Sequence, residues 1–188
     1  MLTIILNSFA LVALSEMGDK TQLLAFSLAA KFKKPWTVLF GILAATLLNH
    51  ALATSFGSWI SDHLEPRILS GILAVTFIVF GFWTLKSEPL EKSRSSHFGP
   101  FLTTAFLFFI AEMGDKTQLA TIALAAKYNS VVWVTLGTTL GMLATDGLAV
   151  FLGEKLTEKL QMKWIRLAAA CWFFVFGLLS GYKAVFDL

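Results

Sequence analysis

Six long apolar segments constrain this chain more than any other feature of its sequence. They cover roughly Leu2–Ala30, Pro35–Ile60, Ile68–Leu85, Phe98–Ala126, Val131–Gly153 and Ile165–Tyr182. Most of them reach the ~20 residues that a helix needs to cross a bilayer. Because backbone groups in lipid must find partners within their own segment, helices are expected here and not isolated strands. We therefore predict an all-α membrane protein with six transmembrane helices.

The composition supports a membrane protein and excludes some classes of partner. Of the 188 residues, 56% are hydrophobic and 14% are charged, whereas about a quarter of a soluble domain is charged. No basic cluster alternates with exposed aromatic residues, so we expect no nucleic-acid partner. The first residues lack the basic region of a signal peptide, so we expect the first segment to be retained as a span.

One octapeptide occurs twice, each time inside an apolar segment. Residues Glu16–Leu23 read EMGDKTQL, and Glu112–Leu119 repeat the same letters 96 residues later. The surrounding stretches Ser15–Phe32 and Ala111–Tyr128 share 12 of 18 residues. A charge at the centre of a bilayer costs ~3 kcal/mol, so the charges of the two copies together would cost roughly 15–20 kcal/mol if they were unrelieved. Such a cost favours a functional role for these residues.

The duplication extends beyond the octapeptide to both halves of the chain. At the same offset of 96, Gly41 matches Gly137, and His50 falls opposite Asp146. Each half then contains three helices, and an odd number makes the second half enter the membrane from the opposite side. We predict two inverted three-helix repeats, whose substrate site lies near the midplane. The predicted units are residues 1–86, a cytoplasmic linker at 87–97, and residues 98–188.

Basic residues are unequally distributed between the two sets of connections. Ten follow the first, third and fifth segments, and three lie on the other side. The ten are Lys31, Lys33, Lys34, Lys86, Lys92, Arg94, Lys155, Lys159, Lys163 and Arg166, and the three are Arg67, Lys127 and Lys183. By the positive-inside rule, the ten face the cytoplasm. We therefore expect both termini to lie on the outer side.

The first and fourth segments are too long for a straight span. A helix of 29 residues reaches ~43 Å, against ~30 Å of hydrocarbon. Such a helix must tilt, protrude or break. Gly18 and Gly114 lie beside the charges, near the middle of these segments, and are the natural places for a bend. An ordinary tilted helix is the alternative.

The residue types of the octapeptides indicate a site for a hard cation. On a continuous helix, Glu16 and Asp19 share a face, and Lys20 can pair with Glu16. Inverted repeats would bring four carboxylates together, and oxygen ligands suit Ca²⁺, Mg²⁺ or Mn²⁺. Four like charges cannot all stay ionised when the ion leaves, which favours exchange with protons. The expected supporting or proton-coupling residues are Lys20, Thr21, Gln22, Lys116, Thr117, Gln118, Asn49 and Asp146. Plain structural ion pairs are the alternative for the two lysines.

The doubled Glu-Met-Gly-Asp-Lys-Thr-Gln resembles the signature of the family once labelled uncharacterised protein family 0016. These are the Golgi-type calcium/manganese–proton exchangers, a branch of the cation/Ca²⁺ exchangers, and both copies match the family pattern at every position. The resemblance implies that the metal-binding acids are Glu16, Asp19, Glu112 and Asp115. It also implies export of Mn²⁺ or Ca²⁺ from the cytoplasm in exchange for protons.

The short chain resembles the bacterial members of that family, which are associated with manganese efflux. The expected location is therefore the bacterial cytoplasmic (inner) membrane, with the metal as transported substrate and not as cofactor. A Ca²⁺/H⁺ antiporter, a divalent-cation channel and an amino-acid exporter are alternatives. We expect no enzymatic activity, because the sequence has no Ser–His dyad, HExxH motif or nucleotide-binding loop. The oligomeric state is left open.

Overall fold

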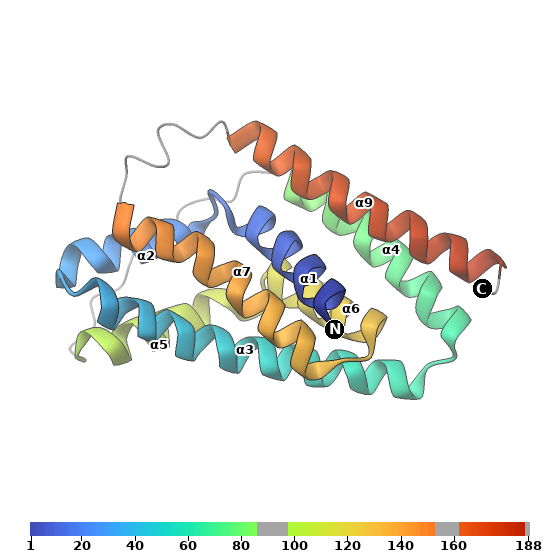
Figure 1. Cartoon of the computed structure of the whole chain (residues 1–188), viewed down its shortest axis with the longest axis horizontal. Coiled ribbons are helices and arrows are strands. Elements are labelled where there is room, and N and C mark those ends of the chain that lie inside the picture. The colour runs from blue at the N-terminus through green and yellow to red at the C-terminus, as the bar shows by residue number, and fades with distance from the viewer. Residues whose placement is uncertain (86–97, 153–161, 187–188) are drawn as a thin grey trace.

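The computed structural model describes residues 1–85, 98–152 and 162–186, and every regular element in these ranges is a helix. The helices are α1 (Leu2–Glu16), α2 (Lys20–Phe32), α3 (Pro35–His63), α4 (Pro66–Thr84), α5 (Pro100–Glu112), α6 (Lys116–Tyr128), α7 (Val131–Leu152) and α9 (Met162–Phe186) (Figure 1). The predicted all-helical class is confirmed for these residues. The predicted linker at 87–97 lies outside them, as do Lys86, Lys92, Arg94, Lys155 and Lys159.

The number of candidate membrane spans in the described ranges is smaller than the six transmembrane helices predicted. Within the described ranges, α3, α4, α7 and the Leu167–Phe186 part of α9 are each long and apolar enough to cross a bilayer. Helices α1 and α2 would make a fifth span together, bent by 74° at their junction. Helix α5, with 13 residues, is apolar but shorter. The difference arises because the first and fourth predicted segments are each interrupted at their octapeptide.

Proline and left-handed residues set many of the helix boundaries. Pro35, Pro66 and Pro100 occupy the first turns of α3, α4 and α5, where a missing N–H costs nothing. Lys33 and Asn129 end α2 and α6 with φ of 53° and 45°, which is a common way to stop a helix. The chain therefore turns back sharply at both places, and α3 and α7 pack beside the helices that precede them.

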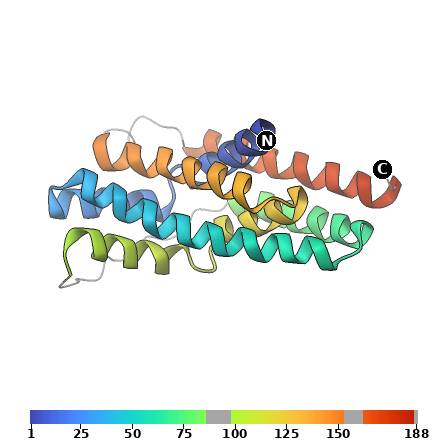
Figure 2. The same cartoon turned by 60° about the horizontal axis from the view of Figure 1, so that its bottom comes forward.

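Helix α3 runs along the length of the bundle and packs against α5, α6 and α7 (Figures 1 and 2). Close helix contacts recur at positions 96 residues apart. A Cβ atom at Gly41 would lie 2.8 Å from Thr104 Cβ, and one at Gly137 would lie 2.8 Å from Ser8 Cβ. Small residues let helix backbones approach closely in a membrane. The two halves therefore use equivalent glycines for equivalent contacts.

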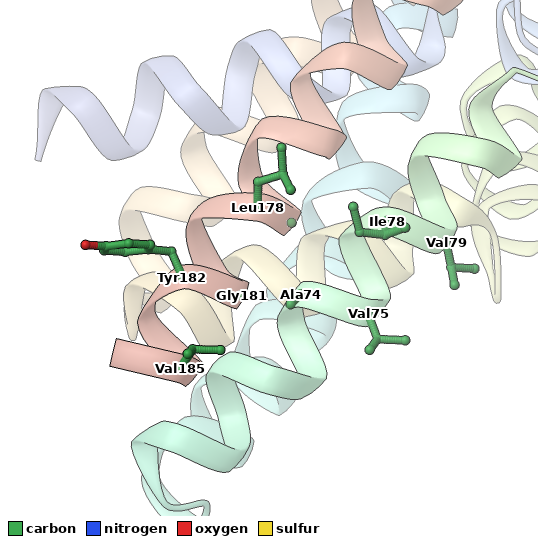
Figure 3. Close-up of a pocket in the computed structure, with 9 residues that line it drawn as sticks. Ala74, Val75, Ile78, Val79, Leu178, Gly181, Tyr182 and Val185 are labelled. Atoms are coloured by element: carbon green, nitrogen blue, oxygen red, sulfur yellow. The ribbon is translucent and has the colours of Figure 1, made fainter. Parts of the chain in front are cut away.

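Helices α4 and α9 lie side by side along one side of the bundle (Figure 1). An open apolar groove of about 600 Å³ lies between them (Figure 3). Its lining residues are Ala74, Val75, Ile78, Val79, Gly177, Leu178, Gly181, Tyr182 and Val185. None of these side chains is charged and several are largely exposed, as expected of a surface that faces lipid. The groove is therefore not the predicted cation site.

Candidate metal-transport site

Both octapeptides lie where one helix ends and the next begins. Residues Met17–Asp19 separate α1 from α2, and Met113–Asp115 separate α5 from α6. Gly18 and Gly114 adopt φ values of 79° and 78°, in the left-handed region that residues with a Cβ atom avoid. The predicted bends at these glycines are confirmed, and the tilted continuous helix is excluded.

The aspartate of each copy caps the helix that follows the break. Asp19 Oδ1 accepts the backbone N–H of Lys20 at 2.8 Å, and Asp115 Oδ1 accepts that of Lys116. Aspartate is favoured at this position because its side chain satisfies an N–H group that has no partner within the helix. Capping uses one oxygen of each carboxylate and leaves Oδ2 for another partner.

The glutamine of each copy stabilises the bend. Gln22 Oε1 accepts the backbone N–H of Gly18 at 2.9 Å, and Gln118 Oε1 accepts that of Gly114 at 2.8 Å. Gln22 Nε2 also donates to the carbonyl oxygen of Thr145 on α7 at 3.1 Å. A break in a helix exposes N–H groups that must be paired elsewhere. The glutamines therefore hold the backbone of the site in place.

The lysine of each copy pairs with the aspartate of the other copy. Lys20 Nζ lies 3.3 Å from Asp115 Oδ2, and Lys116 Nζ contacts Asp19 Oδ2. The continuous-helix geometry that would place each lysine over the glutamate four residues earlier is absent, because the break falls between the two residues. The prediction that Glu16 and Asp19 share one helical face fails for the same reason. The crossed ion pairs join the two octapeptides in the interior of the bundle.

The two glutamates have different surroundings although their octapeptides are identical. Glu16 accepts hydrogen bonds from Thr21 Oγ1 at 2.8 Å and from Thr117 Oγ1 of the other copy. Glu112 is 1% exposed, and neither of its oxygens has a hydrogen-bond partner among the described residues. Leaving a buried polar group unpaired costs ~1–3 kcal/mol. Such a group calls for an explanation, and a ligand or proton bound there is one.

Two other predicted residues lie close to the octapeptides. Asp146 on α7 is 0% exposed, lies near enough to Glu16 and Asp19 to interact with their charges, and has both oxygens unpaired within the described ranges. Asn49 on α3 is 1% exposed and donates from Nδ2 to the carbonyl oxygen of Phe109 at 3.1 Å. The oxygen atoms of both side chains are thus placed in the interior with bonding capacity unused.

The acids do not form a ready-made metal cage in this conformation. In the part of the chain that the structure describes, no three His, Cys, Asp or Glu side chains are grouped so that they could hold one metal ion. The ion pairs offer a physical reason, since an ammonium group already contacts Oδ2 of each aspartate. That Glu16, Asp19, Glu112 and Asp115 bind one ion together stays a prediction.

A row of buried polar groups joins α3 to α7, and its threonines were not predicted. Thr54 Oγ1 lies 2.7 Å from Thr135 Oγ1, and His50 Nδ1 lies 3.4 Å from Thr139 Oγ1. All four side chains are at most 7% exposed. The signal in the sequence is the group of threonines in the fifth apolar segment. It is weak, because such hydroxyls often bond only to their own helix.

Comparison with known proteins agrees with these features. Apolar helices with buried acids at helix breaks are typical of membrane transporters. The family model "Divalent cation/proton antiporter GDT1" matches residues 4–92 and 100–187, which is nearly the whole chain. The chain belongs to the GDT1 family, and it is therefore a multi-pass membrane transporter and not an enzyme. The resemblance found from the octapeptides is confirmed.

Relatives that match this chain come from bacteria and plants. A protein of Vibrio cholerae serotype O1 named "Putative manganese exporter" is 40% identical over 183 residues, covering 96% of this chain and 92% of that protein. A GDT1-like protein of Synechocystis is 29% identical over 212 residues, covering 98% and 100%. "GDT1-like protein 3" of Arabidopsis thaliana is 26% identical over 203 residues, covering 93% and 69%. No solved structure matches this chain.

Proposed function

We propose that this protein exports Mn²⁺ from the bacterial cytoplasm across the inner membrane in exchange for protons, through a site built from the two octapeptides. The description of the family and the name of the Vibrio relative support a divalent cation as cargo. The observation that carries the proposal is the pair of crossed ion bridges, Lys20 with Asp115 and Lys116 with Asp19. These bridges join the acidic segments of both halves inside the bundle.

The proposed ligands are carboxylate oxygens from both copies, namely Glu16, Asp19, Glu112 and Asp115. All four side chains are at most 5% exposed, so a bound ion would be shielded from lipid. Oxygen ligands suit Mn²⁺ and also Ca²⁺, whereas the octapeptides contain no His or Cys for a softer metal. In this proposal Thr21 and Thr117 orient Glu16, and the oxygens of Asn49 and Asp146 lie nearby as further ligands or proton carriers.

The charges of the site support an exchange of metal for protons. Four carboxylates and two ammonium groups leave a net charge of −2 (2 − 4 = −2) when all six groups are ionised. One divalent cation, or two protons, would neutralise this charge. Because like charges in a low-dielectric interior resist joint ionisation, release of the metal is expected to accompany protonation. We therefore propose that one metal ion exchanges for two protons.

The lysines have a proposed part in the transport cycle, since they hold the aspartates when no metal is bound. Each aspartate uses Oδ1 as a helix cap and Oδ2 as the partner of an ammonium group. A cation that replaced the ammonium at Oδ2 would leave the cap intact. Metal binding would then exchange partners locally without unwinding α2 or α6, which keeps the cost of reorganisation low.

We propose further that residues 1–86 and 98–188 form inverted repeats with six spans in all, so that the site can open alternately to the two sides. The crossed ion pairs support this arrangement, because each becomes the other when the two halves are exchanged. Thr46 Oγ1 also lies 3.2 Å from Met142 Sδ, and these residues are 96 positions apart. Two equivalent residues can touch only near a twofold axis.

The proposed orientation follows the positive-inside rule. Lys31, Lys33 and Lys34 gather where α2 turns into α3 and are all exposed. We propose that this end of the bundle faces the cytoplasm. The opposite end of the bundle would then be the outer end. It carries the N-terminus, the C-terminus, the α3–α4 connection and the α6–α7 connection (Figure 1).

The proposal can be tested with purified protein in lipid vesicles. Mn²⁺ entry driven by an imposed pH gradient is followed with a fluorescent indicator inside the vesicles. Glu16→Gln and Asp19→Asn are expected to reduce this flux to the level of empty vesicles, because each removes a proposed ligand charge. The matched control is Glu65→Gln, since Glu65 is an exposed acid at the start of α4 and should leave the flux unchanged.

Other outcomes would point to the competing functions. Mn²⁺ flux that ignored the pH gradient would contradict antiport and favour a divalent-cation channel. Flux of Ca²⁺ without flux of Mn²⁺ would make the protein a Ca²⁺/H⁺ antiporter. Undiminished Mn²⁺ flux in both Glu16→Gln and Asp19→Asn would show that the octapeptides are not the site.

A further inference from the structure

Three pairs of side chains form a ladder between the antiparallel helices α3 and α7. From the middle of the bundle outwards, the pairs are Thr46 with Met142 at 3.2 Å, His50 with Thr139 at 3.4 Å and Thr54 with Thr135 at 2.7 Å. The ladder starts next to Asn49, at the level of the octapeptides. One turn beyond its last pair, Ser58 Oγ donates to Asn129 Oδ1 at 2.6 Å, at the exposed outer end. The α3–α7 ladder therefore spans the distance from the site to the outer solvent.

In the other half of the bundle, the positions equivalent to the threonines of the two outer pairs carry alkyl groups, whereas the position equivalent to His50 carries the acid Asp146. At the offset of 96, Thr54 corresponds to Val150, Thr135 to Leu39, Thr139 to Leu43, and the buried Thr121 of α6 to Ala25. Val150 and Ala25 belong to the apolar cluster that fills the cytoplasmic half. The two halves use equivalent glycines for their packing, so the arrangement of their helices is alike. They differ in the polarity of the side chains at these positions, which is higher along the path that leads outwards.

One member of the α3–α7 ladder and one threonine of α6 have unused bonding capacity. His50 Nε2 and Thr121 Oγ1 have no hydrogen-bond partner within the described residues, although the two side chains are 1% and 0% exposed. Buried groups of this kind are normally paired with ordered water. Both groups lie in the outer half of the bundle. Water in the outer half would satisfy both, whereas the alkyl side chains of Val150, Leu39 and Leu43 in the cytoplasmic half offer water no partners.

We propose that the α3–α7 ladder is a hydrated half-path that carries protons between the octapeptide site and the outer end of the bundle. This inference rests on the proposed function. Its three pairs offer hydroxyl, imidazole and thioether groups and no carboxylate, which suits a chain of water better than a dehydrated divalent cation. Each oxygen along the chain accepts one proton and releases another to the next. One proton taken from the outer solvent therefore delivers one proton to the site and leaves the path unchanged.

Accessibility to a water-soluble reagent tests the hydration directly and does not depend on transport. In a Cys171→Ala background, which removes the single exposed cysteine, we compare Thr54→Cys with its counterpart Val150→Cys. The reagent is a small, charged methanethiosulfonate added to protein in lipid vesicles. Thiols react as thiolates, which form where water reaches them, so Thr54→Cys is expected to react roughly tenfold faster or more.

The two positions make this comparison sharp. Thr54 is 0% exposed and Val150 is 8% exposed, so exposure in the structure alone predicts the opposite order. Equal rates, or faster reaction of Val150→Cys, would overturn the hydrated path. A second pair, Thr135→Cys against Leu39→Cys, decides the matter in the same way if a variant of the first pair does not fold.

The proton-carrying role has a test of its own. The double variant Thr54→Val and Thr135→Val is expected to slow pH-driven Mn²⁺ flux by roughly tenfold, the size of effect that follows from losing one ordinary hydrogen bond in the limiting step. The affinity for Mn²⁺ should stay unchanged, because neither residue is a proposed ligand. The control is Thr104→Val, because the buried hydroxyl of Thr104 donates to the carbonyl oxygen of Pro100 in its own helix and has no other partner among the described residues.

The outcomes of the two tests separate the inference from the proposed function. Undiminished flux in the double variant, or a matching loss of Mn²⁺ affinity, would overturn the role of the ladder in proton transfer. A wild-type protein without any Mn²⁺ flux would contradict the proposed function, while the labelling rates would still decide whether the path is hydrated.

Discussion

The two crossed ion pairs are expected to differ in strength although their residues are equivalent in sequence. The side chains of Lys116 and Asp19 are 6% and 3% exposed, whereas Lys20 is 21% exposed and its Nζ lies 3.3 Å from Asp115 Oδ2. The side chain of Asp115 is only 1% exposed, but water that reaches Lys20 screens this pair and takes the place of the lysine beside Asp115 when the lysine is removed, so the pair contributes ~1 kcal/mol or less. Removing one partner from a buried pair costs ~3–5 kcal/mol, because the other charge remains buried.

The magnitudes follow from this difference. Lys116→Gln is expected to lower the free energy of unfolding by ~3 kcal/mol, and Lys20→Gln by ~1 kcal/mol. For a chain of this size, 1 kcal/mol corresponds to ~2–4 °C in Tm. The expected decreases in Tm are therefore roughly 6–12 °C for Lys116→Gln and roughly 2–4 °C for Lys20→Gln.

Thermal unfolding in detergent micelles, followed by tryptophan fluorescence, measures these values. Each lysine variant is also combined with the neutralised partner, Asp19→Asn or Asp115→Asn, so that a double-mutant cycle isolates the energy of the pair. Neutralising Asp19 should recover much of the Tm lost in Lys116→Gln, since no unpaired charge then remains. Equal decreases for the two lysines, or equal coupling energies in the two cycles, would refute the argument from burial.

Three further expectations concern the bends, the packing and the site. Gly18→Ala should lower the free energy of unfolding by ~1–2 kcal/mol, because its φ of 79° strains a residue with a Cβ atom; an unchanged Tm would contradict this. Gly177→Ala should lower the free energy of unfolding by ~1–3 kcal/mol, because the new Cβ would lie 2.9 Å from an isoleucine of α4. Gly181→Ala should lower it by much less, because its Cβ would lie 3.6 Å from an alanine. Similar Tm values for the two variants would contradict this expectation. Thr117→Val should raise the KM for Mn²⁺ transport, because it removes a hydrogen bond to Glu16, and a KM equal to that of the wild type would mean that Thr117 does not position the glutamate.

Much of the site could be predicted because charge inside an apolar segment is costly. Glu16, Asp19 and Lys20 stand out from their neighbours in the sequence, and the same octapeptide in the other half points to a joint site. The bend was also predictable, since a segment of 29 residues exceeds the thickness of the bilayer and contains Gly18 beside its charges. Polar residues that recur among apolar ones without charge, such as Thr135, carry a weaker signal.

The partners of the charged groups could not be predicted. Rules for neighbours three or four residues apart hold only along an unbroken helix, and the break at Gly18 removes the geometry on which they depend. The pairing of Lys20 with Asp115 joins residues from opposite halves of the chain. Such a contact depends on how α2 and α6 begin inside the bundle, which no local pattern in the sequence describes.

By itself, the sequence determined that this protein is a helical membrane protein with a duplicated acidic segment, because hydrophobic length and buried charge are properties of single segments. Only the tertiary structure decided that two identical octapeptides have different surroundings. Both threonines, Thr21 and Thr117, bond to Glu16, while Glu112 has no partner among the described residues. The physical reason is that the residues packed around the two copies differ, so the equivalence of the copies in sequence cannot extend to their environments.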